Sequence, residues 1–159
     1  MIQMSRTNTG GGDQLFYISP LSTLTNTSYP LLEFTSQLTG NSTTCISRIS
    51  GTARLDVNER YTNLGCNLLT VDSAELRQLG FLLLGNGDKP MGFYDVAVYN
   101  NPDPGSYPNI NLDPTGLTIL WRGLMNLTAS DDFPAIQYTE YTTNDSDIES
   151  VYITNKPNN

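Results

Sequence analysis

Residues 91–99, with the sequence MGFYDVAVY, and residues 117–127, with the sequence LTILWRGLMNL, decide the fold class. Apolar and polar side chains alternate along both segments with a period of two, which is typical of a β-strand whose two faces differ. Three side chains of the first segment share one face and are predicted to be buried: Tyr94, Val96 and Val98. Trp121, in the middle of the second segment, is predicted to pack between two sheets.

Shorter segments of the same kind lie between Gly- and Pro-rich turns, where Pro fixes φ and Gly permits a positive φ. Further strands are predicted at residues 2–7, 14–18, 31–35, 43–49, 61–71 and 149–154. Residues 73–80 fit one helical turn with Asp72 as N-cap, although residues 81–84 fit a strand better. We therefore predict an all-β fold, namely a single immunoglobulin-like or jelly-roll-like antiparallel β-sandwich of about seven to nine strands with little or no helix.

The chain has 159 residues, which suits one domain. We assign residues 15–154 to the sandwich, residues 1–14 to a flexible N-terminal arm and residues 155–159 to a flexible tail. Both ends are polar, and such ends often become ordered only against a neighbour. The sequence has no run of about 18 apolar residues, so we expect no transmembrane helix, and its first residues do not resemble a signal peptide.

The composition argues against two classes of partner. Sixteen acidic and eight basic residues give a net charge of −8, whereas nucleic acids and anionic membranes attract basic surfaces. Charged residues make up only 15% of the chain, below the usual quarter of a soluble domain. The resulting neutral polar surface favours an extracellular, viral or densely assembled protein.

Residues that could carry catalysis are few. The chain has no histidine, so a Ser–His–Asp or Cys–His site is excluded and a zinc site is not expected. Cys45 and Cys66 fit no zinc or redox motif; we expect two separate thiols, unless their strands are neighbours and allow a disulfide. We predict no enzyme, no cofactor and no metal. Two weaker alternatives remain, a calcium loop at residues 144–147 and a hydrolase that uses paired acids, with candidate side chains Asp131, Asp132, Glu140, Asp145, Asp147 and Glu149.

Nine tyrosines are explained most simply by packing across strands, although exposed tyrosines can contact sugars or proteins. Two of them flank a Pro-rich loop, and the N-terminal arm carries apolar and basic side chains. On this basis we predict partner-binding residues at Ile2, Met4, Arg6, Tyr99 and Tyr107.

Several strand and turn motifs occur in a characteristic order: YPLLEFT (29–35), ERYTN (59–63), GFYDVAVY (92–99), NLDP (111–114) before the strand at 117–123, then YTEY (138–141) and VY (151–152). This order resembles that of small immunoglobulin-like structural proteins associated with the virions of tailed bacteriophages. The resemblance extends over residues 29–153 and is interrupted at residues 45–51 and 71–85.

The resemblance implies an immunoglobulin-like sandwich within a phage virion and names no active site. We expect a minor capsid or decoration (cement) protein that binds the major capsid protein through its surface and termini, as a homo-oligomer in a particle assembled in the host cytoplasm. One alternative is a head–tail connector or tail-associated structural protein. An alternative of another class is a carbohydrate-binding adhesion module that uses aromatic side chains and loop carboxylates around residues 101–111.

Overall fold

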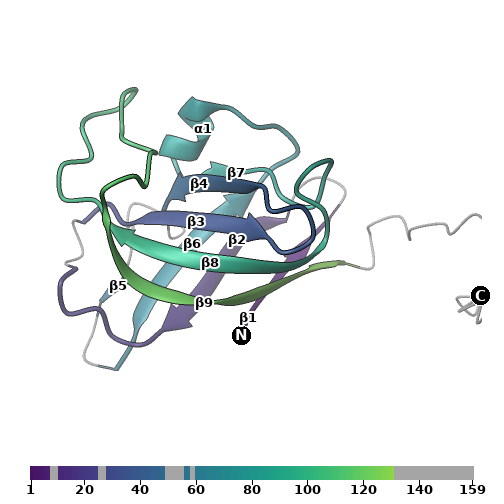
Figure 1. Cartoon of the computed structure of the whole chain (residues 1–159), viewed down its shortest axis with the longest axis horizontal. Helices are drawn as coiled ribbons and strands as arrows, with labels where there is room; N and C mark the ends of the chain where they lie inside the picture. Colours follow the sequence, from purple (N-terminus) through teal and green to yellow (C-terminus); the bar gives the residue numbers. More distant parts are fainter. Residues whose placement is uncertain (8–10, 25–27, 49–55, 58–59, 131–159) are drawn as a thin grey trace, which may run out of the picture.

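The protein is a β-sandwich. The computed structural model describes residues 1–7, 11–24, 28–48, 56–57 and 60–130. Within these ranges nine strands and one short helix form two packed sheets (Figure 1). The predicted all-β sandwich with little helix is therefore confirmed. The strand expected at residues 149–154 and the tail at residues 155–159 lie outside the described residues.

The larger sheet has five strands, in the spatial order β1 (Ile2–Arg6), β9 (Thr118–Ala129), β8 (Gly92–Asn100), β3 (Leu31–Ser36) and β4 (Ser42–Ile46). Strand β9 is long and curves around one side of the molecule (Figure 1). A β-bulge shifts the register of β8 against β9: Val98 pairs with Trp121, whereas the next residue, Tyr99, pairs with Ile119. Such a bulge bends its strand, which agrees with the curvature of β9.

In the second sheet, β6 (Thr62–Leu68) pairs with each of the other three strands, β2 (Gly12–Ile18), β5 (Asp56–Val57) and β7 (Phe81–Leu82). Most strand pairs are antiparallel, as predicted. Two pairs are parallel, β1 with β9 and β6 with β7. Parallel neighbours need a long connection between them, and most of the sandwich separates β1 from β9 in the sequence.

Residues 72–84 combine both predicted interpretations. Helix α1 (Ala74–Gln78) begins after Ser73, whose Oγ accepts a hydrogen bond from the Leu76 amide at 3.1 Å, so the N-cap is one residue later than predicted. Gly80 follows the helix with φ +83°, and β7 comes next. With five residues, this helix is too short to cross a membrane, and the described part of the chain contains no longer one.

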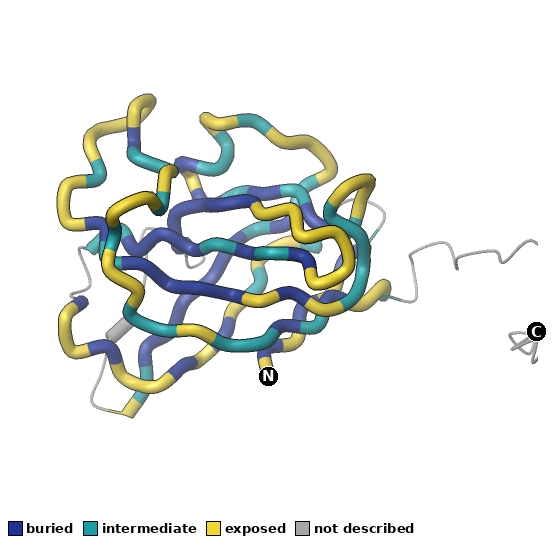
Figure 2. The backbone as a smooth tube through the Cα atoms, viewed as in Figure 1, coloured by how far each residue is buried: buried dark blue, intermediate teal, exposed yellow. Residues whose placement is uncertain are grey.

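The core lies between the two sheets. Tyr94, Val96 and Val98 are buried there as predicted, and Trp121 packs against its margin while remaining partly exposed. Buried and exposed residues alternate along β1, whereas β4 and β6 are buried along most of their length (Figure 2). Burial of apolar surface is the main favourable contribution to folding of this kind of sandwich.

The N-terminal residues form strands, which corrects the prediction of a flexible arm at residues 1–14. Strand β1 pairs with β9 along its whole length, and β2 pairs with β6 from Gly12 onward. Ile2 and Met4 are buried in the core, while Gln3 and Ser5 are exposed. The alternation of apolar and polar residues over residues 2–5 is the local signal of this strand, and the polar residues that follow do not prevent its pairing with β9.

Candidate functional site

The loop between β8 and β9, residues 101–117, covers one end of the outer face of the larger sheet. Its side chains help to bury a second, smaller apolar cluster that comprises Leu31, Ile46, Ala97, Tyr99 and Ile110. Three hydrogen bonds hold this loop. The Ile110 amide donates to Gln78 Oε1 (2.9 Å), Thr44 Oγ1 donates to the Leu112 carbonyl (2.7 Å), and Asn101 Nδ2 donates to the Asn111 carbonyl (3.1 Å).

Beside the smaller cluster, the outer face contains a hollow of about 470 Å³. Register places three residues side by side across it, because Ala97 on β8 pairs with Glu33 on β3 and with Arg122 on β9. The small side chain of Ala97 leaves space between the two charged residues. We call this space the sheet hollow; it is lined by Glu33, Thr35, Asp95, Val96, Ala97, Tyr99, Arg122 and Gly123.

Two carboxylates line the sheet hollow, Glu33 from β3 and Asp95 from β8. Asp95 pairs with Thr35 and is thus a diagonal neighbour of Glu33. In the usual geometry of a sheet, the Cβ atoms of diagonal neighbours are about 7 Å apart. Tyr99 donates from its hydroxyl to Glu33 Oε2 at 2.6 Å, and Gln37 Nε2 donates to Asp95 Oδ1 at 2.9 Å. Burial, followed by the hydrogen bond to Glu33, raises the pKa of Tyr99 to about 12, so this phenol stays protonated and keeps donating near neutral pH.

The charged groups of the sheet hollow are available to a ligand. Neither of the two ion pairs among the described residues, Arg77–Asp72 and Lys89–Asp88, involves Glu33, Asp95 or Arg122. Both Asp95 and Arg122 are exposed. Surface charges without an ion-pair partner are suited to recognising a group of opposite charge on another molecule.

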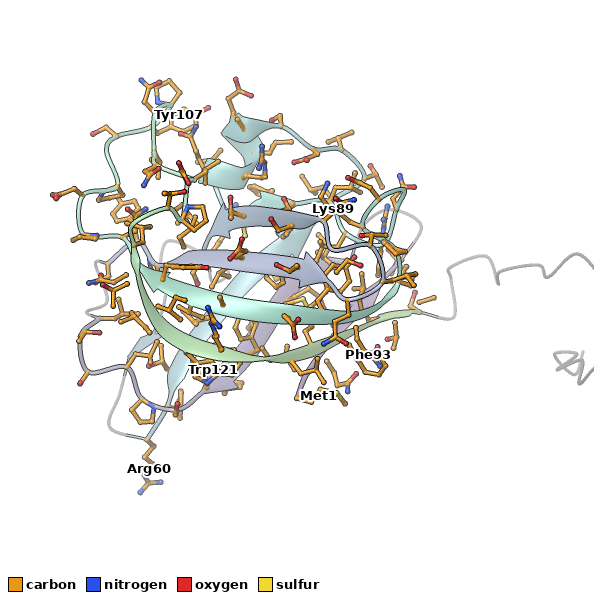
Figure 3. The ribbon with its side chains drawn as sticks, viewed as in Figure 1. Met1, Arg60, Lys89, Phe93, Tyr107 and Trp121 are labelled. Carbon is orange, nitrogen blue, oxygen red and sulfur yellow. The ribbon has the colours of Figure 1, made fainter. Side chains whose placement is uncertain are left out.

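Apolar side chains continue the outer face away from the loop. Phe93 precedes Asp95 on the same face of β8 and is 49% exposed, and Leu124 pairs with Asp95. Figure 3 shows Phe93 and Met1 at the same end of the molecule. We use the name open face for Phe93 and Leu124 together with five of the residues that line the sheet hollow, namely Glu33, Thr35, Asp95, Ala97 and Arg122. An aromatic ring beside charged groups on a rigid sheet is a common composition for a binding surface.

The structure does not bring the five predicted partner-binding residues together. Ile2 and Met4 point into the core, and the buried Arg6 donates a hydrogen bond to the Leu84 carbonyl while burial lowers its pKa. Tyr99 is buried, belongs to the smaller cluster and also lines the sheet hollow. Tyr107 is 54% exposed but lies on the loop at the opposite end of the molecule from Met1 (Figure 3).

The residues of the open face were missed because sequence analysis treated charges within strands as ordinary outward positions. Glu33, Asp95 and Arg122 each interrupt an apolar strand, and this was the available signal. Their convergence depends on the register of β3, β8 and β9, which local sequence does not contain.

The weaker chemical alternatives cannot be placed on the described structure. All six acids considered for hydrolysis, and the candidate calcium loop at residues 144–147, lie outside the described residues. In the part of the chain that is described, no three Cys, Asp or Glu side chains gather as ligands of a metal ion.

The comparisons with known proteins gave no relative. No family model matches the chain, no curated protein is significantly similar to it, and no solved structure matches its fold significantly. The functional interpretation therefore depends on the sequence and on the geometry of the open face.

Proposed function

We propose that this chain is a non-enzymatic structural protein of a bacteriophage virion that decorates the capsid shell. The observation that carries the proposal is the open face, a rigid sheet surface on which charged and aromatic side chains are exposed beside a shallow hollow. The order of strand motifs supports a virion protein. A repeated shell lets each contact be weak, because many copies bind together.

The partner surface is expected to present a lysine or arginine to the sheet hollow. Two carboxylates, Glu33 and Asp95, line the hollow against one guanidinium, Arg122, and the whole chain carries a net charge of −8. A basic side chain of the partner between the two carboxylates, with an acidic side chain of the partner near Arg122, would neutralise both the negative and the positive charge of the sheet hollow. Opposite charges of this kind chiefly increase association rate and specificity.

The open face, rather than a sheet edge, is the proposed contact surface. At the β1 edge, the Ser5 amide donates to Gln14 Oε1 at 3.1 Å. Beyond the β4 edge, the Arg48 amide donates to the Gly65 carbonyl of β6 at 2.6 Å. The β1 edge is thus partly occupied by the chain itself, and directly after β4 the chain turns onto β6 of the other sheet; both features limit the addition of a foreign strand.

The test uses shells assembled from the major capsid protein encoded in the same genome. The labelled chain is mixed with shells, and cosedimentation is measured over a range of salt. Two variants alter the sheet hollow, namely Ala97→Leu, which fills it, and Glu33→Gln combined with Asp95→Asn, which removes its negative charge. Each is expected to weaken binding at least about tenfold, whereas Val71→Ser, at an exposed position before α1, should bind normally.

The outcomes separate the function from its site. Full binding by both open-face variants, with native circular dichroism, would place the contact elsewhere on the chain. Absence of the chain from purified particles, together with no binding to shells, would overturn the virion proposal. Copy number distinguishes the alternatives, because a decoration protein is present in hundreds of copies, whereas a head–tail connector has about six or twelve, as the symmetry of the junction requires.

A carbohydrate-binding module is the second candidate, and the sheet hollow is the observation that favours it. Hydrogen-bonding groups on Thr35, Asp95 and Arg122 surround a space of the size of a small ligand. Of the aromatic side chains considered for this candidate, Tyr99 is buried and Trp121 packs against the core, whereas Tyr107 is exposed on the loop. A glycan array probed with the native chain and with Arg122→Gln tests this candidate. No signal above background would remove this candidate, and equal signals from both proteins would place glycan binding outside the sheet hollow.

A further inference from the structure

The two sheets come into direct backbone contact at the end of β4. The amide of Arg48 donates to the Gly65 carbonyl at 2.6 Å, and the Gly65 amide donates to Ser47 Oγ at 3.2 Å. A Cβ atom on Gly65 would lie only 2.4 Å from the Arg48 carbonyl oxygen, a distance that no side chain tolerates. The glycine therefore allows the chain that leaves β4 to approach β6 far more closely than the usual separation of about 10 Å between packed sheets.

Two cysteines flank this contact, one on each strand. Cys45 precedes Ser47 by two residues on β4, and Cys66 follows Gly65 on β6. Both are free thiols, both belong to the same core cluster, and they are 0% and 1% exposed. The thiol of Cys45 interacts directly with that of Cys66 and, together with burial, raises the pKa of Cys66. Both thiols therefore belong to one buried cluster, on strands that the Arg48–Gly65 hydrogen bond holds together at this end of the core.

We propose that Cys45 and Cys66 form an oxidative cross-link site, at which a disulfide joins the two sheets of the sandwich when the chain folds in an oxidising environment. The bond would fix the β4–β6 contact covalently. This inference is independent of the proposed function, because it depends only on the packing of the two strands.

The reaction is a thiol–disulfide exchange with a small-molecule disulfide such as oxidised glutathione. The thiolate of one cysteine attacks the reagent, forms a mixed disulfide and releases one reagent thiol; the thiolate of the second cysteine attacks the mixed disulfide and releases the other. Both protein thiol protons end on the two reagent thiols, so that the protein is oxidised and the reagent reduced by two electrons. Burial and the raised pKa of Cys66 make the folded dithiol slow to react, so the bond should form during folding.

The experiment compares refolding of the native chain with oxidised glutathione and with a reducing agent. Oxidised material is expected to lose two hydrogen atoms in intact mass and to resist alkylation in denaturant. Peptide mapping should join the peptides of Cys45 and Cys66 within one molecule. A bond that closes a loop of about 20 residues should raise the midpoint of thermal unfolding by about 10 °C in a domain of this size.

Matched variants keep the test specific. In the double variant Cys45→Ala and Cys66→Ala, which has no thiol left to react with glutathione, oxidation should leave the unfolding midpoint unchanged relative to the same variant under reducing conditions, so any loss of stability from the substitutions themselves cancels. The proposal is overturned if the native chain retains two alkylatable thiols after oxidative refolding. A disulfide that forms only between molecules, or one that lowers the unfolding midpoint, overturns it equally.

Discussion

Strand β1 offers a sharp test, because a flexible arm and a core strand predict opposite results. Combined replacement of Ile2 and Met4 by alanine removes two apolar side chains that are 8% and 2% exposed in the core. Deletion of residues 1–7 removes the strand altogether and leaves the long β9 as an unpaired edge. If the N-terminal segment were a flexible arm, neither change would affect folding.

The expected cost follows from burial. A buried Ile or Met replaced by alanine typically costs about 2–5 kcal/mol. Ile2 lies near the margin of the core and should fall at the lower end, whereas Met4 is nearly inaccessible and should cost about 3 kcal/mol. Because the two side chains share one face of β1, their effects will not add fully, and we expect about 4–5 kcal/mol for the pair. That is close to the whole stability of many domains, about 5–15 kcal/mol.

Urea denaturation followed by Trp121 fluorescence and far-ultraviolet circular dichroism measures this loss directly. Gln3→Ala is the matched control, because its exposed side chain lies between the two buried positions, and it should change the free energy of unfolding by less than about 0.5 kcal/mol. The deletion should be unfolded or close to its unfolding midpoint without denaturant. If the double variant and the deletion both remain within about 1 kcal/mol of the native chain, the reasoning about β1 is refuted.

Three further predictions concern particular contacts. Gly65→Ala should cost at least about 3 kcal/mol in urea denaturation, because the new Cβ meets the Arg48 carbonyl oxygen; a cost below about 1 kcal/mol would contradict the close approach of β4 and β6. Burial raises the pKa of Tyr94 from 10 to about 12, so the contribution of the neutral phenol to the free energy of unfolding is complete below pH 10 and is lost as the pH rises to 12. The loss should be about 1–2 kcal/mol after allowance for solvent near the hydroxyl, and it should be smaller in Tyr94→Phe. Equal losses in both proteins would show that Tyr94 is not the group that titrates. Tyr99→Phe should lower the free energy of unfolding by about 1–2 kcal/mol through loss of the hydrogen bond to Glu33, and an unchanged stability would show that this bond contributes nothing.

The strands were predictable because their signal is local. The run predicted at residues 91–99 corresponds to β8 (Gly92–Asn100), and the run at 117–127 to β9 (Thr118–Ala129). Tyr94 and Val96 were correctly assigned to the core. Alternation with a period of two identifies both the strand and its inward face, so short segments of sequence suffice for this part of the structure.

The open face could not be predicted, because the signal that defines it is not local. Glu33, Ala97 and Arg122 become neighbours only when β3, β8 and β9 pair in one register, and a shift by a single residue would turn each of them inward. The parallel pairing of β1 with β9 likewise joins the two ends of the described chain. Contacts between segments so distant in sequence depend on the packing of the whole sandwich, and no local pattern specifies them.

The covering loop explains why the outer face is divided into a closed and an open half. On β8, Tyr99 lies beneath the loop and contributes to the smaller apolar cluster, whereas Phe93, on the same face, is exposed. Ala97 lies between them, at the boundary, where its small side chain creates the sheet hollow. Because Gln78 and Thr44 fix the loop by hydrogen bonds, this boundary is set before any ligand arrives. A surface that needs little reordering loses less entropy on association, which is the physical reason to expect binding at the sheet hollow rather than at the loop tip that carries Tyr107.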